Sequence, residues 1–198
     1  LNSDIGYLRG LGFKLPGIVM AIAKNKKICV LGGYGVGKSA LVRRYVGNGF
    51  VSEYEATLGA DVAVADLRVG SEQIRFSIWE MQGVDSGHGV LSSYLKGADG
   101  FIYEADGTRP HTLYEIPSLK RICDQVAGPR PGVLFLTKSD KRSEWVLTRS
   151  MCQPFVNAGW KTYCTSANSG MNVDQGFYAL AERMSGVETS GGGYVHAP

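Results

Sequence analysis

Residues 32–39 read GGYGVGKS and match the pattern G-x-x-x-x-G-K-[ST]. The pattern follows a short apolar run at 28–31 and opens a segment, 38–46, whose apolar residues recur at helical spacing. Glycines let the backbone wrap closely, so that its amides point inward at the N-terminus of the following helix and form a nest for anions. The sequence therefore predicts a phosphate-binding loop between a strand and a helix.

The side chains at the end of this loop predict the ligand. Lys38 would reach the β- and γ-phosphates of a nucleoside triphosphate, and the Ser39 hydroxyl would ligate Mg²⁺. The alternative is a glycine-rich turn with a chance lysine, but the strand before it and the helix after it favour the phosphate loop. The residues expected to line the phosphate cradle are Gly35, Val36, Gly37, Lys38, Ser39 and Ala40.

Composition limits the other classes of function. The chain has 198 residues, 44% of them hydrophobic and 20% charged, which suits one globular domain with a sizeable core. A net charge of +3 without a run of five or more like charges does not favour nucleic acid. The four cysteines show no metal-site spacing or disulfide framework, so buried free thiols, a reducing compartment and a cytoplasmic location are expected.

The sequence patterns at the two ends of the chain differ from the pattern in its middle. Residues 1–23 contain no apolar run of the roughly 18 residues that a membrane span needs, and we assign them as a leader of unknown role. Residues 187–198 end in GGGYVHAP, which predicts a disordered tail, and the lack of a cysteine there predicts no prenyl anchor. Residues 24–186 remain as the folded domain.

Strand and helix patterns alternate through that domain. An apolar run or an alternating pattern predicts six strands, at 28–31, 61–69, 74–78, 100–105, 133–137 and 162–166. Helical spacing predicts helices at 38–46, 112–127, 143–156 and 173–184. We therefore predict an α/β fold of the P-loop NTPase type: a six-stranded, mostly parallel sheet with one antiparallel strand and helices on both faces. Ligands of such sheets bind at the carboxyl ends of the strands.

Four further motifs predict which nucleotide the chain binds. They are FVSEYEAT at 50–57, WEMQG at 79–83, TKSD at 137–140 and TSAN at 165–168. In this order and spacing, residues 24–186 resemble the Ras superfamily of small GTPases and its Rab-like branch. The segment ADGTRP at 105–110 resembles a segment found in the Rab-like GTPases of prokaryotes.

This resemblance implies a site for GTP or GDP with Mg²⁺. Asp140 would take the guanine N1–H and exocyclic amine with its two carboxylate oxygens, a pairing that rejects adenine. Lys138 would lie against the base, the Ala167 amide would meet the guanine carbonyl oxygen, and Phe50 would cover the base or ribose edge. Thr57 would complete the Mg²⁺ shell and sense the γ-phosphate. The same motifs add Gly83, Thr137, Ser166 and Asn168 to the expected nucleotide contacts.

Two of these positions differ from the family pattern without an expected loss of binding. The family usually has asparagine where Thr137 stands, and we expect a weaker hydrogen bond there with guanine specificity retained. Lysine is commoner where Asn168 stands, and we expect this surface change to have little consequence.

The residues expected to hold Mg²⁺ and to catalyse hydrolysis depart further from the family pattern. The resemblance assigns Mg²⁺ to Ser39, Thr57 and Glu80, and hydrolysis to Lys38, Thr57, Gly83 and Val84. Glu80 stands where aspartate is usual, so its reach to the metal is strained. Val84 stands where a glutamine usually orients the attacking water, and Tyr34 places a large side chain beside the γ-phosphate, where it would obstruct a partner's arginine. We therefore expect slow hydrolysis of GTP.

Three functions follow from these observations. The first is a guanine-nucleotide switch in which Mg·GTP orders residues 50–60 and 83–94, and protein effectors and regulators read the ordered surface, with Trp79 and Tyr94 as aromatic contacts. The second is a pseudo-GTPase, a scaffold or binding module that does not cycle. The third, a P-loop kinase that uses ATP, is opposed by Asp140 and by the lack of a lid or acceptor motif.

Overall fold

The computed structural model describes residues 23–48, 54–57, 60–81 and 88–186. Apart from residue 23, the predicted leader and tail lie outside these ranges, as do Phe50, Gly83 and Val84. Within the described residues, no helix is long and apolar enough to cross a membrane.

The strands of the described residues form one sheet in the order β2-β3-β4-β1-β5-β6-β7. Their bounds are β1 Lys24–Gly32, β2 Tyr54–Thr57, β3 Ala60–Val69, β4 Glu72–Met81, β5 Gly100–Asp106, β6 Gly132–Thr137 and β7 Lys161–Cys164. β1 pairs in parallel with β4 and β5, and β5, β6 and β7 continue the parallel arrangement. β3 is antiparallel to β4. The prediction of a mostly parallel P-loop NTPase sheet with one antiparallel strand is confirmed.

The structure adds a short strand to the six that were predicted. β2 has four residues, YEAT, and pairs antiparallel with β3 at the edge of the sheet. So short a segment carries too few residues to show an alternating pattern. It brings Thr57 of the expected first switch segment into register with Ala60 of β3.

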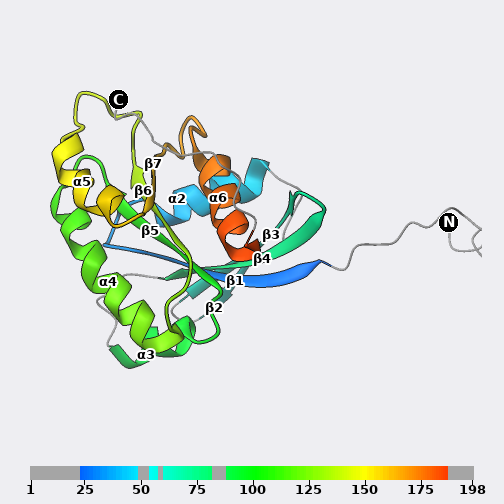
Figure 1. The fold of residues 1–198 in the computed structure, drawn as a ribbon. Coiled ribbons are helices and arrows are strands. Elements are labelled where there is room, and N and C mark those ends of the chain that lie inside the picture. Colours follow the sequence, from blue (N-terminus) through cyan, green and yellow to red (C-terminus); the bar gives the residue numbers. More distant parts are fainter. Residues whose placement is uncertain (1–22, 49–53, 58–59, 82–87, 187–198) are drawn as a thin grey trace, which may run out of the picture.

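Helices cover both faces of the sheet (Figure 1). Their bounds are α2 Lys38–Asn48, α3 His88–Leu95, α4 His111–Ala127, α5 Arg149–Asn157 and α6 Val173–Ser185. α2 and α6 pack their apolar side chains into the core on one face, and α3, α4 and α5 pack theirs on the other. Every residue of β5 is buried, as expected of a central strand covered on both sides.

Two helices differ from the sequence-based expectation. α5 begins at Arg149 rather than at residue 143, because Thr148 caps it: the Thr148 hydroxyl accepts a hydrogen bond from the Met151 amide at 3.4 Å. A turn occupies residues 142–144 instead, and residues 145–148 lie in neither a helix nor a strand. α3 was not predicted as a helix, and all of it except Leu95 falls in the second expected switch segment, 83–94.

The cysteines fit the prediction of free thiols. All four are unpaired, and Cys29, Cys123 and Cys164 are buried while Cys152 is half-buried. Burial raises the pKa of the Cys29 thiol to about 12, which keeps it neutral and unreactive.

Candidate functional site

The phosphate loop leaves the carboxyl end of β1 and enters α2. Its backbone needs glycine at two positions, because Gly35 and Gly37 have φ values of +68° and +121°. Gly32 is needed for a different reason, since a Cβ there would lie 2.5 Å from the carbonyl oxygen of Glu104. The glycines of the motif therefore serve both the shape of the loop and its close approach to β5.

Lys38 closes this loop from inside. Its side chain is buried, and its Nζ donates hydrogen bonds to the carbonyl oxygens of Gly32 at 3.0 Å and Gly33 at 3.1 Å. Burial lowers the pKa of Lys38, and the nearby carboxylates of Glu104 and Glu80 oppose that shift. The ammonium is thus held at the centre of the predicted phosphate cradle.

Ser39 and Glu80 meet beside Lys38, as expected of two metal ligands. The Ser39 hydroxyl donates a hydrogen bond to Oε1 of Glu80, and Oε2 of that carboxylate is buried without a hydrogen-bond partner among the described residues. Burial raises the pKa of Glu80, although the bond from Ser39 opposes it. A hydroxyl and a carboxylate oxygen are ligands that Mg²⁺ takes alongside phosphate and water. The pair therefore fits a magnesium ion that is shared with a nucleotide.

The base-recognition motifs lie at the ends of β6 and β7. Ser166 donates its hydroxyl to Oδ1 of Asp140 at 2.7 Å, and the Ser139 amide bonds to the carbonyl oxygen of Thr165 at 3.1 Å. These bonds join the two loops that the sequence assigns to guanine. Asp140 and Asn168 are exposed, and Ala167 is half-buried.

Lys138 connects the base motif to the phosphate loop. Its Nζ donates to the carbonyl oxygen of Gly35 at 3.1 Å and to Oδ2 of Asp106 at 2.7 Å. Arg109 contacts the same carboxylate at 2.7 Å and donates to the carbonyl oxygen of Tyr34 at 2.9 Å. A buried aspartate thus holds two cations against the outer side of the phosphate loop.

The charge of Asp106 is stabilised by these contacts. Burial alone would raise the pKa of this carboxyl group, but hydrogen bonds from Lys138, Thr108 and Arg109 outweigh it and lower the pKa to about 2. Sequence reasoning did not assign a role to Asp106 or Arg109. The available signal was an aspartate at the carboxyl end of a buried strand, where ligand sites of α/β sheets form.

Glu104 is a second residue that was missed. It lies in β5, is fully buried, and has no hydrogen-bond partner for either carboxylate oxygen within the part of the chain that the structure describes. Burial raises its pKa to about 8, while Lys38 lowers it and Glu80 raises it. A lone carboxylate in the apolar run GFIYEA was visible in the sequence and marks this position as unusual.

The structure brings most of the predicted site residues to one edge of the sheet. The exceptions concern the switch segments: Phe50, Gly83 and Val84 lie outside the described residues, and of Thr57 only the backbone is described. Tyr34 is 84% exposed on the phosphate loop, so its ring is free to meet whatever approaches there. Trp79 is half-buried against Tyr94, with ring centroids 5.9 Å apart.

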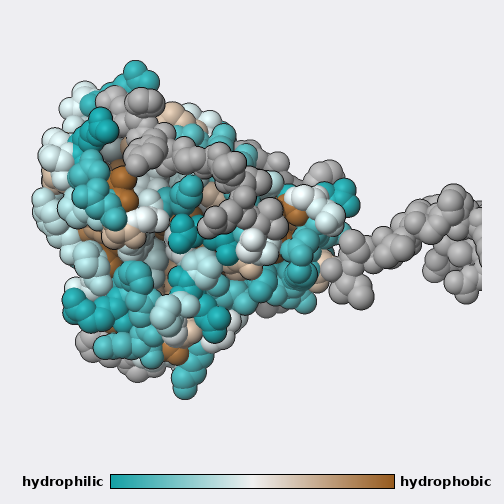
Figure 2. Space-filling model, viewed as in Figure 1, coloured by the Kyte–Doolittle hydropathy of each residue, from teal (hydrophilic) through white to brown (hydrophobic). Residues whose placement is uncertain are grey.

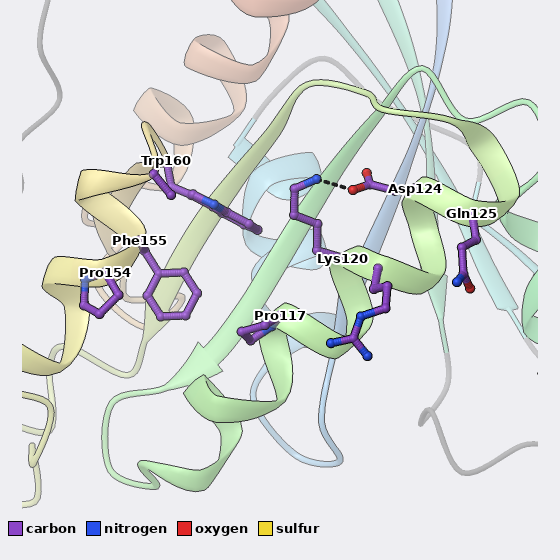
Figure 3. Close-up of a pocket in the computed structure, with 9 residues that line it drawn as sticks. Pro117, Lys120, Asp124, Gln125, Pro154, Phe155 and Trp160 are labelled. Atoms are coloured by element: carbon purple, nitrogen blue, oxygen red, sulfur yellow. Dashed lines mark hydrogen bonds and ion pairs between the residues drawn. The ribbon is translucent and has the colours of Figure 1, made fainter.

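An apolar groove of about 590 Å³ lies elsewhere, between α4 and the end of α5. In Figure 2 small hydrophobic areas show between mostly hydrophilic side chains on the left of the molecule, over the region that these helices occupy in Figure 1. In Figure 3, Pro154, Phe155 and Trp160 face Pro117 and the Lys120–Asp124 ion pair across this groove. No residue of the phosphate loop lines it, so the groove is separate from the candidate site.

Comparison with known proteins agrees with this geometry. The model of the Ras family matches residues 27–186. The chain is also similar to the Ras-related protein Rab-12 of Homo sapiens, with 26% identity over 159 residues. That alignment covers 79% of this chain and 65% of the length of Rab-12.

Proposed function

This chain belongs to the Ras family, and from that membership we propose that it binds GTP and GDP together with Mg²⁺ and acts as a guanine-nucleotide-dependent switch. Its predicted resemblance to Rab-like small GTPases is confirmed by the family match and by the similarity to Rab-12. One observation carries the proposal. Lys138, two residues before Asp140, donates from its Nζ to Gly35 in the phosphate loop, so one residue joins the base side to the phosphate side.

At the phosphate end, Lys38 and the loop amides supply positive charge for the β- and γ-phosphates. Ser39 and Glu80, with Thr57, would hold Mg²⁺. When bound, Mg²⁺ neutralises phosphate charge and bridges the two outer phosphates. Glu80 carries one methylene more than the usual aspartate, so in this proposal it reaches the ion with strain.

At the base end, Asp140 takes the two donors of guanine, N1–H and the exocyclic amine. The bond from Ser166 fixes one of its oxygens, which restricts the orientation of the carboxylate. Adenine presents the opposite polarity at that edge and would leave the carboxylate unpaired. Ala167 and Phe50 complete the guanine site in this proposal.

The proposed switch hydrolyses GTP slowly. Val84 has no polar atom with which to orient water, and the exposed ring of Tyr34 stands where a partner's arginine would enter. The second candidate function, a pseudo-GTPase scaffold, is favoured by the same two residues. The pairing of Ser39 with Glu80 supports binding of Mg²⁺ with nucleotide, which both candidate functions allow, so the rate of hydrolysis is what separates them.

The wider biology follows from the family only in outline. Effectors and regulators would bind at the two switch segments, and residues 24–186 would form the working domain. The four free cysteines support a cytoplasmic location. Because the chain spans 65% of the length of Rab-12, the activity of the whole protein is part of this proposal.

Competition between nucleotides tests the proposal. Purified protein is titrated with a fluorescent GDP analogue, which is then displaced by GTP, ITP or ATP. ITP lacks the exocyclic amine and loses one charge-assisted hydrogen bond, so we expect it to bind about tenfold more weakly than GTP. ATP should bind more weakly still, by on the order of 10³-fold or more.

Two variants control this experiment. Asp140→Ala should bring GTP and ITP to equal, weak affinity, whereas Lys38→Ala should weaken all three nucleotides together. Equal displacement by GTP and ATP from the unchanged protein would contradict guanine recognition, and failure of every nucleotide to bind would contradict the proposed function.

A further inference from the structure

The strand β5 carries two charged side chains, Glu104 and Asp106, and Glu104 follows a run of apolar residues. Phe101, Ile102 and Tyr103 precede Glu104, and all of them are buried. Neither carboxylate oxygen of Glu104 has a hydrogen-bond partner in the described part of the chain. A buried carboxylate is unfavourable without hydrogen bonds or a counter-charge, so the charge state of Glu104 depends on the cation that acts on it most strongly.

That cation is Lys38, which acts on Glu104 more strongly than any other charged group. Glu104 and Gly32 are paired in the β1–β5 register, and a Cβ on Gly32 would lie 3.2 Å from the Cβ of Glu104. At the other end of the loop, a Cβ on Gly37 would lie 4.0 Å from Oε2 of Glu104. The carboxylate therefore lies directly beneath the phosphate loop, on the side opposite the predicted phosphates.

The geometry points to Glu104 as a positioning residue that limits the affinity for nucleotide by competing with the phosphates for the Lys38 ammonium. This inference rests on the proposed function, because it concerns the same phosphate site. Among the described residues, the Lys38 ammonium donates to two loop carbonyls and makes no ion pair with Glu104, so the two charges interact at longer range. When the negative charge beneath the loop is removed, the Lys38 ammonium interacts with the phosphates of the nucleotide without this competition.

The charged groups around Glu104 define how it responds to pH. Lys38 faces it from α2 and Glu80 from β4, and Glu115 of α4 acts on Lys38 from the exposed side. The Asp106–Lys138 pair lies at the outer side of the same loop. A bound polyphosphate brings further negative charge, so binding favours the neutral form of Glu104 and takes up a proton.

The sign of the effect follows from this linkage. Because bound nucleotide raises the pKa of Glu104 above its free-state value of about 8, the affinity is highest at low pH and falls as pH rises through that value. At low pH a neutral Glu104 resembles glutamine. The ratio of the affinities of wild type and Glu104→Gln cancels the titration of the phosphates, which is common to both.

The experiment measures GDP affinity for the full chain at pH 6.0 and pH 8.5, with Mg²⁺ and again in EDTA. We expect Glu104→Gln to bind GDP up to about fourfold more tightly than wild type at pH 8.5, where a carboxyl group with a pKa of about 8 is mostly ionised, and with nearly the same affinity as wild type at pH 6.0. Asp66→Asn is the matched control, because Asp66 pairs with Arg75 next to Asn25, at the end of β1 away from the phosphate loop, and should change the affinity by less than about twofold at either pH. A merely structural role of Glu104 predicts weaker binding by the variant, not tighter binding.

Glu104→Val is a second variant, which places an apolar, β-branched side chain typical of a buried parallel strand. It should show the same tighter binding at pH 8.5, and it replaces Glu104→Gln if that variant does not fold. Unchanged or weaker affinity of the folded variants, with wild type binding normally, overturns the inference. Loss of nucleotide binding by wild type and every variant overturns the proposed function instead.

Discussion

The hydroxyl oxygen of Thr137 lies 2.6 Å from the carbonyl oxygen of Val36, which joins the end of β6 directly to the phosphate loop. The same oxygen lies 3.2 Å from the carbonyl oxygen of Ala105 in β5. A hydroxyl has one proton to donate, so the shorter contact with the loop takes it. Threonine thus holds the loop from below at the position where the family usually has asparagine.

Removal of this hydroxyl tests its role. Thr137→Val keeps the shape of the side chain but leaves the Val36 carbonyl unpaired in a buried place, so we expect a loss of about 1–2 kcal/mol in the free energy of unfolding. We also expect GDP to dissociate several-fold faster, as measured with a fluorescent analogue, because the loop is less well held. Thr137→Ser keeps the hydroxyl and should release GDP at nearly the wild-type rate.

Thr137→Asn completes this series. The expectation that threonine forms a weaker bond than asparagine stays a prediction, and slower GDP release by Thr137→Asn would support it. Equal release rates for wild type and Thr137→Val would show that the contact with Val36 does not hold the loop.

The buried carboxylate of Asp106 gives a prediction about acid stability. Its pKa of about 2 in the folded protein lies below the usual value of about 3.9, so the unfolded chain takes up the proton first. The stabilisation, about 2.6 kcal/mol, is therefore present above about pH 4 and lost as pH falls from 4 towards 2. Urea unfolding should show Asp106→Asn to be less stable than wild type by about that amount at pH 7, with a much smaller difference near pH 2.5.

An exposed ion pair supplies the control for this prediction. Asp66 pairs with Arg75 at 2.8 Å on the surface of β3 and β4, where water screens both charges. Asp66→Asn should cost less than about 1 kcal/mol at pH 7. If the two variants lose equal stability, burial of Asp106 is not the reason for its contribution.

The parts of the molecule that could be predicted are those set by short stretches of sequence. The phosphate loop is one run of eight residues whose glycines need positive φ or close approach, and the buried parallel strands show as apolar runs. These local features were enough to predict a mostly parallel sheet of the P-loop NTPase type, while the order of its strands comes from the structure. The start of α5 was placed too early because the pattern before Thr148 is also apolar in part, and only the capping bond marks the true boundary.

The parts that could not be predicted depend on contacts between distant residues. Asp106 and Lys138 are separated by 32 positions in the chain and meet only because β5 and β6 are neighbours in the sheet. Glu104 differs, since its position in an apolar run was readable, but its partner Lys38 was not. Propensity and periodicity carry no information about which charge lies opposite which.

The contact between Ser39 and Glu80 predicts how the protein responds to Mg²⁺. If Glu80 reaches the ion with strain, then Glu80→Asp, with the shorter side chain, should slow GDP release in Mg²⁺ by several-fold. Glu80→Gln lacks the charge and should speed release. In EDTA the three proteins should release GDP at rates within about twofold of one another, because no ion is left to hold. Different rates that persist in EDTA would place the effect of Glu80 on the fold rather than on the metal.

Hydrolysis itself gives the remaining prediction, which concerns Val84 at a position outside the described residues. Because valine cannot orient the attacking water, single-turnover hydrolysis of bound GTP should be slow in the wild type. Val84→Gln supplies the missing polar group and should raise the rate on the order of tenfold or more. Val84→Leu changes the side chain without adding a polar atom, so it should leave the rate within about twofold of wild type. Brisk hydrolysis by the unchanged protein would contradict the expected slow turnover, whereas a slow wild type that Val84→Gln fails to accelerate would favour the pseudo-GTPase scaffold.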